Sequence, residues 1–114
     1  MDKQLSDVDN GYMVLNEEYR IVYANDAFQN LVGSDYDSKG LIGCRFDIFL
    51  PPSGSLFFHL HFHTLILMNG KVENMKIDIK SISGTEFITI PIRINAEKRV
   101  QDGKVLYDCF IVVE

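Results

Sequence analysis

Short apolar runs separated by polar residues open the chain. Residues 11–15 and 20–24 are mostly apolar, and the polar run Asn16-Glu17-Glu18 separates them. Apolar runs of this length bounded by turn residues are typical of β-strands. We therefore predict that the chain begins with a hairpin.

The residues after this hairpin carry the signals of a short helix. Asn25 can accept a hydrogen bond from a first-turn amide, Asp26 suits the positive end of a helix, and Gly33 supplies a stop. The residues that would face the core recur at helical spacing, namely Phe28, Leu31 and Val32.

Residues 34–50 predict further short helices, because possible caps are followed by spaced apolar anchors. The possible caps are Ser34, Asp35 and Asp37. The anchors are Leu41, Ile42, Phe46, Phe49 and Leu50. Pro51 and Pro52 then prevent continuation.

Three strands are predicted in the second half of the chain. Residues 75–80 alternate apolar and polar side chains with a period of two. Residues 87–94 place isoleucines on one face, and Pro91 requires a bulge or an unpaired position because proline cannot donate to a sheet ladder. Residues 105–113 are apolar on both faces apart from Asp108, which predicts a central strand covered on both sides.

The run FFHLHFHT, residues 57–64, allows two interpretations. In a strand, its three histidines would point to one side and could converge on a zinc ion. In a helix, only His59 and His63 share a face. The dipeptide Asn69-Gly70 can either close a hairpin or end a helix. The residues alone leave both structures open.

Length and composition are those of one domain. A chain of 114 residues with 46% hydrophobic content can bury a single core. The longest apolar run, residues 65–68, is far shorter than the roughly 20 residues of a membrane-spanning helix. Residues 1–4 lack the apolar region of a signal peptide. We therefore expect a cytoplasmic protein with no membrane partner.

Charge and motifs narrow the function classes. The formal net charge is −5 and the basic residues are scattered, which argues against nucleic acid as a partner. Cys44 and Cys109 have no CxxC spacing and are expected to be reduced thiols. The sequence holds no nucleophile elbow, phosphate loop or zinc-protease motif, so we expect no catalytic residues.

The order of predicted elements is strand, strand, several short helices and three strands, which is an α+β pattern with helices on one side of an antiparallel sheet. The run GYMVLNEEYRIVYANDAFQNLVG, residues 11–33, resembles the opening of a PAS domain. It has a glycine-led strand, a polar turn, a strand ending in Tyr-x-Asn, and Ala-Phe on a short helix closed by glycine. The run LIGCRFDIFLPP, residues 41–52, is similar to the next PAS segment. The resemblance extends from about residue 8 to the last residue.

This resemblance implies a five-stranded antiparallel sheet in the order 2-1-5-4-3, which cups a pocket beneath short helices and one longer helix. Residues 53–68 would be the longer helix, with Ser53 or Ser55 as its cap. On a helical wheel one group of residues falls together, namely Phe58, Phe62, Leu65 and Ile66. A neighbouring stripe consists of Leu56, Leu60 and Leu67, and the two histidines lie between the groups.

The same resemblance places a ligand pocket between this helix and the sheet. The residues expected to line it are Phe46, Phe58, His59, Phe62, His63, Ile66, Ile77 and Ile90.

The two histidines that share a helix face are interpreted first as structural, partly buried and hydrogen-bonded to backbone or water, with His61 exposed. Alternatively, His59 or His63 contacts a pocket ligand or supplies an axial nitrogen to haem, since some PAS domains hold haem through a histidine on this helix. A zinc site would need further ligands, and the sequence offers no obvious third one. We therefore expect no metal.

Flavin-binding PAS domains carry their photoreactive cysteine in the run Asn-Cys-Arg-Phe-Leu-Gln. The matching stretch, GCRFDI at residues 43–48, differs at three of the six positions. We therefore expect neither flavin nor haem as a resident cofactor. A redox role for Cys44 stays open.

The resemblance implies a regulatory sensor domain without activity of its own. The leader MDKQL, the aromatic-rich helix and residues 68–96 resemble, more narrowly, the PAS domains in front of bacterial general-stress phosphatases and some diguanylate cyclases. We expect one domain over residues 1–114, with a leader at 1–9 and a core at 10–114, and an effector after Glu114. The expected partners are a second copy, this effector and a small molecule. The alternatives are a haem- or flavin-bound sensor and a ligand-free protein–protein interaction module.

Overall fold

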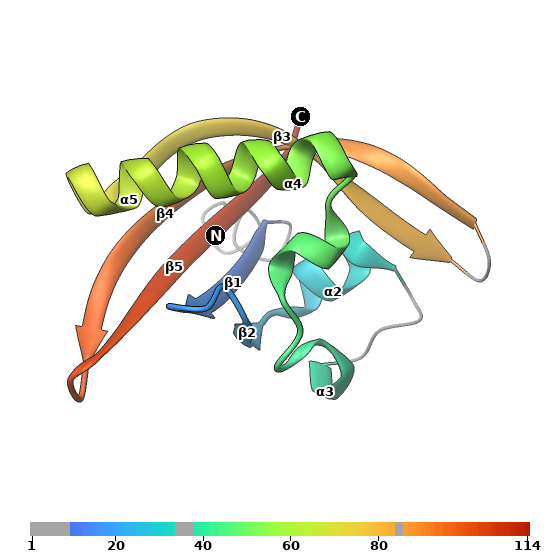
Figure 1. Cartoon of the computed structure of the whole chain (residues 1–114). Coiled ribbons are helices and arrows are strands. Elements are labelled where there is room, and N and C mark those ends of the chain that lie inside the picture. The colour runs from blue at the N-terminus through green and yellow to red at the C-terminus, as the bar shows by residue number, and fades with distance from the viewer. Residues whose placement is uncertain (1–9, 34–37, 84–85) are drawn as a thin grey trace, which may run out of the picture.

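The computed structural model describes residues 10–33, 38–83 and 86–114, in which a sheet is covered by helices (Figure 1). The strands are β1 (Gly11–Asn16), β2 (Ile21–Ala24), β3 (Lys71–Ser83), β4 (Glu86–Gln101) and β5 (Lys104–Val113). The helical elements are α2 (Asp26–Val32), α3 (Ser38–Leu41), the 3-10 helix η1 (Phe46–Phe49), α4 (Pro52–Phe57), the π-helix η2 (Phe58–Phe62) and α5 (His63–Asn69).

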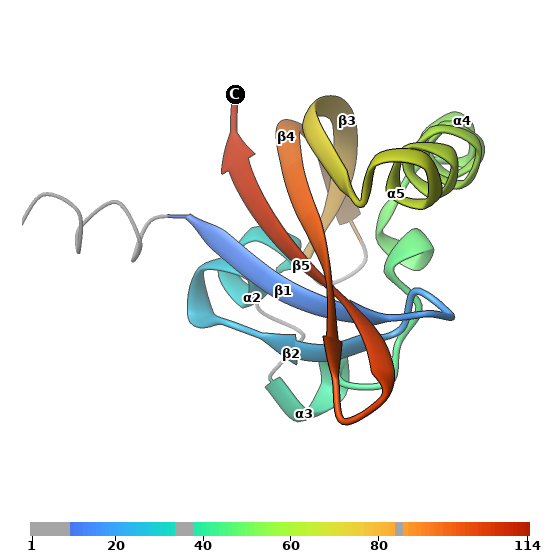
Figure 2. The same ribbon diagram turned by 90° about the vertical axis from the view of Figure 1, so that its left-hand side faces the viewer.

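The strands form one antiparallel sheet in the order β2-β1-β5-β4-β3. This confirms the expected α+β class and the strand order that the family resemblance implied. Figure 2 shows α4 and α5 nearly end-on beside the sheet, so these helices follow one another as a single long element. We call the sheet face that packs against the helices the inner face and the opposite one the outer face.

Strand β5 lies in the middle of the sheet, as predicted, and among the described residues the helices cover only its inner face. Its inner-face residues Tyr107, Cys109 and Ile111 are buried. On the outer face Phe110 keeps 47% of its surface exposed and Val112 is half-buried. The apolar character of β5 therefore exceeds what the core alone requires.

Strand β4 extends from Glu86 to Gln101, well beyond the predicted 87–94. Pro91 pairs with Asp78 of β3 without a register shift, and its carbonyl accepts a hydrogen bond from the Glu114 amide at 2.9 Å. A strand residue directs its nitrogen and carbonyl toward the same neighbour. The proline nitrogen therefore also faces β5, at the point where the pairing between β4 and β5 ends. This is the unpaired position that the sequence required.

Residues 53–68 are helical, as the family resemblance implied, and Gly70 ends the helix with a left-handed φ of 74°. The rival hairpin at Asn69-Gly70 is therefore wrong. The helix begins at Pro52 and has no side-chain cap, so the prediction of Ser53 or Ser55 as cap is also wrong. No helix in the described part of the chain is long and apolar enough to cross a membrane.

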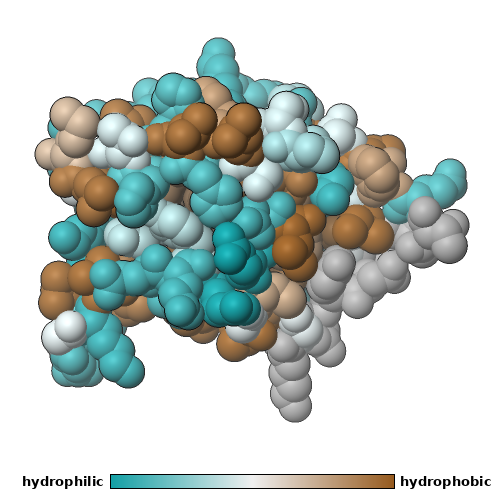
Figure 3. All heavy atoms as spheres, viewed as in Figure 1, coloured by the Kyte–Doolittle hydropathy of each residue, from teal (hydrophilic) through white to brown (hydrophobic). Residues whose placement is uncertain are grey.

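The middle of the long helix is the π-helix η2, and a row of leucines along this helix is exposed. A helical wheel assumes 3.6 residues per turn, whereas a π-helix bonds each residue to the fifth one along. The leucines of the second predicted stripe are exposed over more than half of their surface, namely Leu56, Leu60 and Leu67. Brown, hydrophobic side chains accordingly show at the surface over this helix in Figure 3.

Helix α2 forms as predicted. The Asn25 side-chain oxygen accepts hydrogen bonds from the amides of Phe28 and Tyr12, both at 3.0 Å, so it caps α2 and also ties the helix to β1. Phe28 and Val32 are buried. Of the predicted anchors that follow, Ile42 is exposed and the others are buried, namely Leu41, Phe46, Phe49 and Leu50. The predicted caps Ser34, Asp35 and Asp37 lie outside the described residues.

The glycine at the end of α2 is fixed by a close approach to β3. Gly33 has φ 124° and ψ 157°, a region that essentially only glycine occupies. A Cβ atom at this position would lie 1.8 Å from the carbonyl oxygen of Ile82. Position 33 therefore admits no side chain unless α2 and β3 separate.

We expect Gly33→Ala to lower the free energy of unfolding by about 3 kcal/mol or more, because both a clash and backbone strain must be relieved. Gly70→Ala is the matched control, since Gly70 also has positive φ but has nothing within 4 Å of its Cβ position. It should cost about 1–2 kcal/mol. Urea unfolding followed by circular dichroism measures both. Equal losses in the two variants would contradict the close-packing argument.

Candidate functional site

Aromatic side chains fill the space beneath the long helix. The rings of Phe58 and Phe62 stack with 4.7 Å between centroids, and Phe46 lies 5.1 Å from Phe58. All three have no exposed surface. Five of the eight predicted pocket residues thus belong to one buried cluster, namely Phe46, Phe58, Phe62, Ile66 and Ile77. Their role as a pocket lining stays a prediction.

The other three predicted pocket residues lie at the edge of this cluster. Ile90 is half-buried and packs against it, His59 is half-buried, and His63 is exposed. The structure therefore does not bring the two imidazoles together with the phenylalanines around one space. Each histidine instead bonds a side chain from another element.

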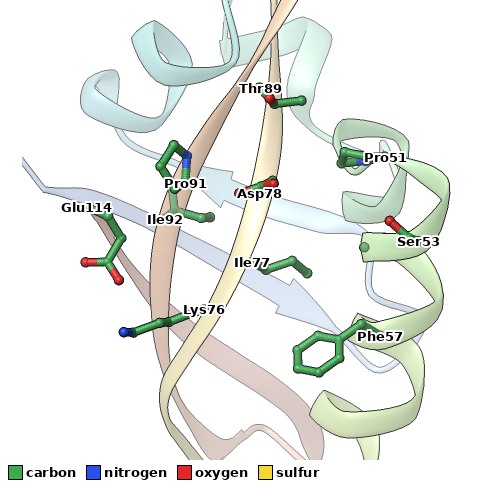
Figure 4. A pocket seen from close by; sticks show the side chains of 11 residues that line it. Pro51, Ser53, Phe57, Lys76, Ile77, Asp78, Thr89, Pro91, Ile92 and Glu114 are labelled. Carbon is green, nitrogen blue, oxygen red and sulfur yellow. The ribbon is translucent and has the colours of Figure 1, made fainter.

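A hollow of about 520 Å³ lies where α4 meets the edge strand β3 (Figure 4). Of the predicted pocket residues it includes only Ile77. Figure 4 shows Ile77 and Phe57 in the space between β3 and α4, whereas Lys76 and Glu114 lie on the side of β3 away from α4. The polar groups around this hollow therefore do not converge on one point.

His59 is tied to the 3-10 helix η1. Its Nε2 lies 2.8 Å from the Asp47 carboxylate, which also accepts a hydrogen bond of 2.9 Å from the Arg45 guanidinium. Burial alone would raise the pKa of Asp47, but the hydrogen bonds from His59 and Arg45 outweigh burial and hold this pKa below its usual value. Asp47 is thus a carboxylate that anchors the π-helix η2 to η1.

His63 is tied to the turn between β1 and β2. Its Nδ1 lies 2.6 Å from the hydroxyl of Tyr19, which is 8% exposed. Burial is the main reason why the pKa of Tyr19 is raised to about 12, with smaller contributions from Tyr107 and Cys109. The phenol therefore keeps its proton near neutral pH and can donate to Nδ1 of the Nε2–H tautomer.

Tyr19 adopts the left-handed backbone conformation, with φ 60°, which is uncommon for a bulky residue. Its ring meets Phe58 and Phe62 edge-on, with 5.5 and 5.7 Å between centroids. Packing and the bond to His63 together hold this conformation. Sequence reasoning missed Tyr19 because a tyrosine at the end of a polar turn carries no local signal of a partner 44 residues away.

The third histidine has no such tie. His61 is exposed, as predicted, and its ring lies 4.3 Å from that of Phe57 on the same helix. Among the described residues, no three His, Cys, Asp or Glu side chains are grouped so that they could hold a metal ion.

The predicted hydrogen-bond partners of His59 and His63 were backbone groups or water. This prediction was wrong, because both histidines bond side chains.

The outer face of the sheet carries a second cluster. Four neighbouring residues of β1, β2 and β5 form what we call the outer aromatic face, namely Tyr12, Tyr23, Phe110 and Val112. The ring of Tyr12 lies 5.7 Å from that of Tyr23 and 5.1 Å from that of Phe110. Tyr23 and Phe110 are about half exposed, at 50% and 47%.

Polar groups border this face. The Tyr12 hydroxyl donates to Asp108 at 2.7 Å, and the Arg99 Nε donates to the same carboxylate at 2.8 Å. Burial first, and then the hydrogen bond to Asp108, raises the pKa of Tyr12. The bond to Asp108 likewise raises the pKa of Arg99. Asp108, noted in the sequence as the one charge within an apolar strand, is therefore the centre of a network.

Comparison with known proteins decides the family. A model of the PAS domain matches residues 9–113. The chain belongs to the PAS family.

Two of the solved PAS structures with the same fold are a PAS domain from a two-component sensor histidine kinase and one from a Desulfitobacterium hafniense protein. Each is 14% identical to this chain with a TM-score of 0.76, and each match covers 98% of this chain. The match covers 91% of the histidine-kinase domain and 99% of the Desulfitobacterium hafniense chain. Among curated proteins, the phosphoserine phosphatase RsbP of Bacillus subtilis (strain 168) is 33% identical over 112 residues. This match covers 98% of the PAS chain and 27% of RsbP, so the chain spans about a quarter of that relative.

We expect Tyr19→Phe to lower the free energy of unfolding by about 1 kcal/mol, because it removes the bond to His63 and keeps the ring. His63→Leu should cost a similar amount, and the double variant no more than either alone, since the two groups act as one pair. A double-mutant cycle by urea unfolding at pH 7 measures this coupling. Additive losses would show that the bond contributes nothing.

We expect Asp47→Asn to reduce stability at pH 7 by about 1 kcal/mol, because charge-assisted bonds to His59 and Arg45 are lost. The folded-state pKa of Asp47 is lowered, so its contribution is complete above the unfolded value near 4 and disappears as pH falls through the folded value. The variant should therefore lose less stability than the parent between pH 5 and about pH 2. Urea unfolding across this range measures the slope, with the exposed Asp78→Asn as control.

Proposed function

We propose that this PAS domain is a sensing and pairing module that regulates an effector enzyme and performs no catalysis itself. The observation that carries the proposal is the 33% identity to the phosphoserine phosphatase RsbP over 98% of the chain. Because the match covers only 27% of RsbP, most of such a protein is left for other domains. The effector is proposed to follow Glu114 and to be a phosphatase, with a diguanylate cyclase as the second candidate.

The signal is proposed to reach the sheet through the long helix. Phe58 and Phe62 of this helix pack into the core, while His59 and His63 tie it to η1 and to the turn before β2. A small molecule that separates the helix from the sheet would break both ties and open the space lined by the predicted pocket residues. No haem or flavin is needed for this response.

A ligand-free interaction module is the second candidate function, and one observation favours it. The five phenylalanines of the core have no exposed surface, namely Phe28, Phe46, Phe49, Phe58 and Phe62. In this version the domain responds to a protein partner instead of a metabolite. An absorbance scan of the purified chain and a thermal-shift screen with small metabolites distinguish a cofactor-bound, a metabolite-binding and a ligand-free domain.

Pairing is proposed to use the outer aromatic face. Large, half-exposed rings grouped on one face of a small domain mark an interaction surface more often than scattered apolar residues do. Two PAS domains paired in this way would hold their effectors side by side. Residues at the centre of such a surface should dominate its affinity.

The effector proposal is tested by a chimera. The matched quarter of RsbP is replaced by this chain, and phosphatase activity toward a phosphoserine peptide is compared with intact RsbP and with RsbP lacking the matched region. Activity that is retained and differs from that of the truncated protein supports regulation by this domain. Activity identical to that of the truncated protein counts against it.

We expect Phe110→Glu to weaken self-association at least tenfold, because it places a charge within the proposed pairing surface. Leu67→Glu is the control, since Leu67 is exposed at 64% on the long helix, away from the outer face. It should leave association unchanged. Sedimentation-velocity centrifugation over a range of concentrations measures both. Unchanged association in Phe110→Glu would move the pairing surface elsewhere.

A further inference from the structure

The network of Tyr12, Asp108 and Arg99 lies within the outer face of the sheet, where the folded core does not require it. Tyr12 is on β1, Asp108 on the central β5 and Arg99 on β4, so the three residues span neighbouring strands. Both carboxylate oxygens of Asp108 are engaged, one by Tyr12 and one by Arg99. The guanidinium also donates to the side chain of Gln101.

This network adjoins a shallow hollow on the outer aromatic face. The hollow measures about 420 Å³, and Tyr12 and Asp108 line it together with Tyr23, Phe110 and Val112. The Asp108 side chain is only 18% exposed, whereas that of Arg99 is 38% exposed. A partner seated on the aromatic rings would therefore cover a carboxylate whose hydrogen bonds are already made.

The charges of this face favour a second copy of the same chain as the partner. Arg93 and Glu97 lie on β4 at equal distances along the strand on either side of Asn95, and all three share the outer face. A two-fold axis near Asn95 and perpendicular to the strand would set Arg93 of one copy opposite Glu97 of the other. Arg93 also donates to Glu114 of its own chain at 3.2 Å, so this pairing would place a second carboxylate beside its guanidinium. The face is complementary to itself in charge at Arg93 and Glu97 and carries apolar rings.

We propose that, when two copies pair through the outer aromatic face, the network of Tyr12, Asp108 and Arg99 fixes their relative orientation. This inference rests on the pairing proposed above and assigns a role to particular residues within it. Apolar rings tolerate several packing angles, because dispersion and burial are not directional. The Arg99 guanidinium does not, because its Nε and Nη1 already donate within the chain and its remaining N–H groups lose water without gaining an acceptor in an orientation that buries them wrongly.

The network would act as a single buried polar residue does in a coiled coil, where it selects one register at some cost in affinity. Leucine at position 108 would remove the acceptor shared by Tyr12 and Arg99, but it would keep the side-chain volume and extend the apolar surface of the outer aromatic face. Association would then persist while the orientation loses its constraint. Alanine at the same position would remove the same acceptor and would also remove most of the side-chain volume.

The test measures orientation separately from affinity. A spin label is placed on Lys98→Cys in a Cys44→Ser background; Lys98 is exposed on β4 and Cys109 is fully buried. Electron–electron distance measurements give the distribution of distances between the two copies, and sedimentation gives the dissociation constant. The variants are Asp108→Leu, Asp108→Ala and the conservative Tyr12→Phe, each checked for folding by its thermal melting curve.

We expect one narrow distance distribution in the parent and a broad or multiple one in Asp108→Leu, with a dissociation constant within about threefold of the parent. Asp108→Ala should weaken association about tenfold or more, because it removes apolar contact area as well as the shared acceptor, whereas leucine replaces that area. Tyr12→Phe, which removes one donor and keeps the ring, should broaden the distribution less than Asp108→Leu. If the network only stabilises the fold, the distance distributions of Asp108→Leu and Tyr12→Phe should both be as narrow as that of the parent.

The remaining outcomes separate this inference from the pairing itself. A paired Asp108→Leu with the parent's narrow distribution overturns the role of the network and leaves the pairing intact. A monomeric parent, or pairing that Phe110→Glu does not weaken, overturns the pairing surface and the network's role with it. If Asp108→Leu does not fold, Tyr12→Phe decides, because an unchanged distribution in that variant overturns the inference.

Discussion

The burial of Phe58 and Phe62 against the inner face of the sheet is the interaction on which the rest of the structure depends. Full burial of a phenylalanine side chain contributes about 1.5–3 kcal/mol, and this stacked pair contacts Tyr19 as well. The pair fixes where the long helix lies. The ties from His59 and His63 then set how that helix meets η1 and the first turn, so the histidines belong to the edge of the core and not to its interior.

The two faces of the sheet are linked by the alternation of side chains along its strands. Tyr107 and Cys109 of β5 are buried in the core, while Asp108 between them belongs to the outer network. A shift of β5 large enough to admit a molecule beneath the helix would therefore also move Asp108. One central strand thus connects the proposed sensing side with the proposed pairing side.

Elements with strong local signals could be predicted from the sequence. The cap at Asn25, the stop at Gly33 and the alternation in residues 75–80 each depend on neighbours in the chain, and the structure confirms them. The order of the strands came from the family resemblance, since no local pattern encodes it. The partners of the histidines could not be predicted, because Tyr19 and Asp47 approach them only once the chain has folded.

The exposed residues of the long helix also show what the sequence alone could not predict. Leu56, Leu60 and Leu67 form a stripe of their own and are exposed in the structure, although they are as hydrophobic as the buried residues of the same helix. Hydrophobicity alone did not separate these leucines from the buried phenylalanines. The same holds for Phe110, whose apolar character reflects the outer face of the sheet.

The π-helix has a consequence for reading related sequences. A π-turn contains one residue more than the α-turn it replaces, so a relative with a regular helix here would have one residue fewer between the proline pair and Gly70. An alignment without a gap would then shift either the phenylalanines or the terminal glycine by one position. Placing that single-residue gap inside residues 58–62 keeps both ends of the helix in register across the family.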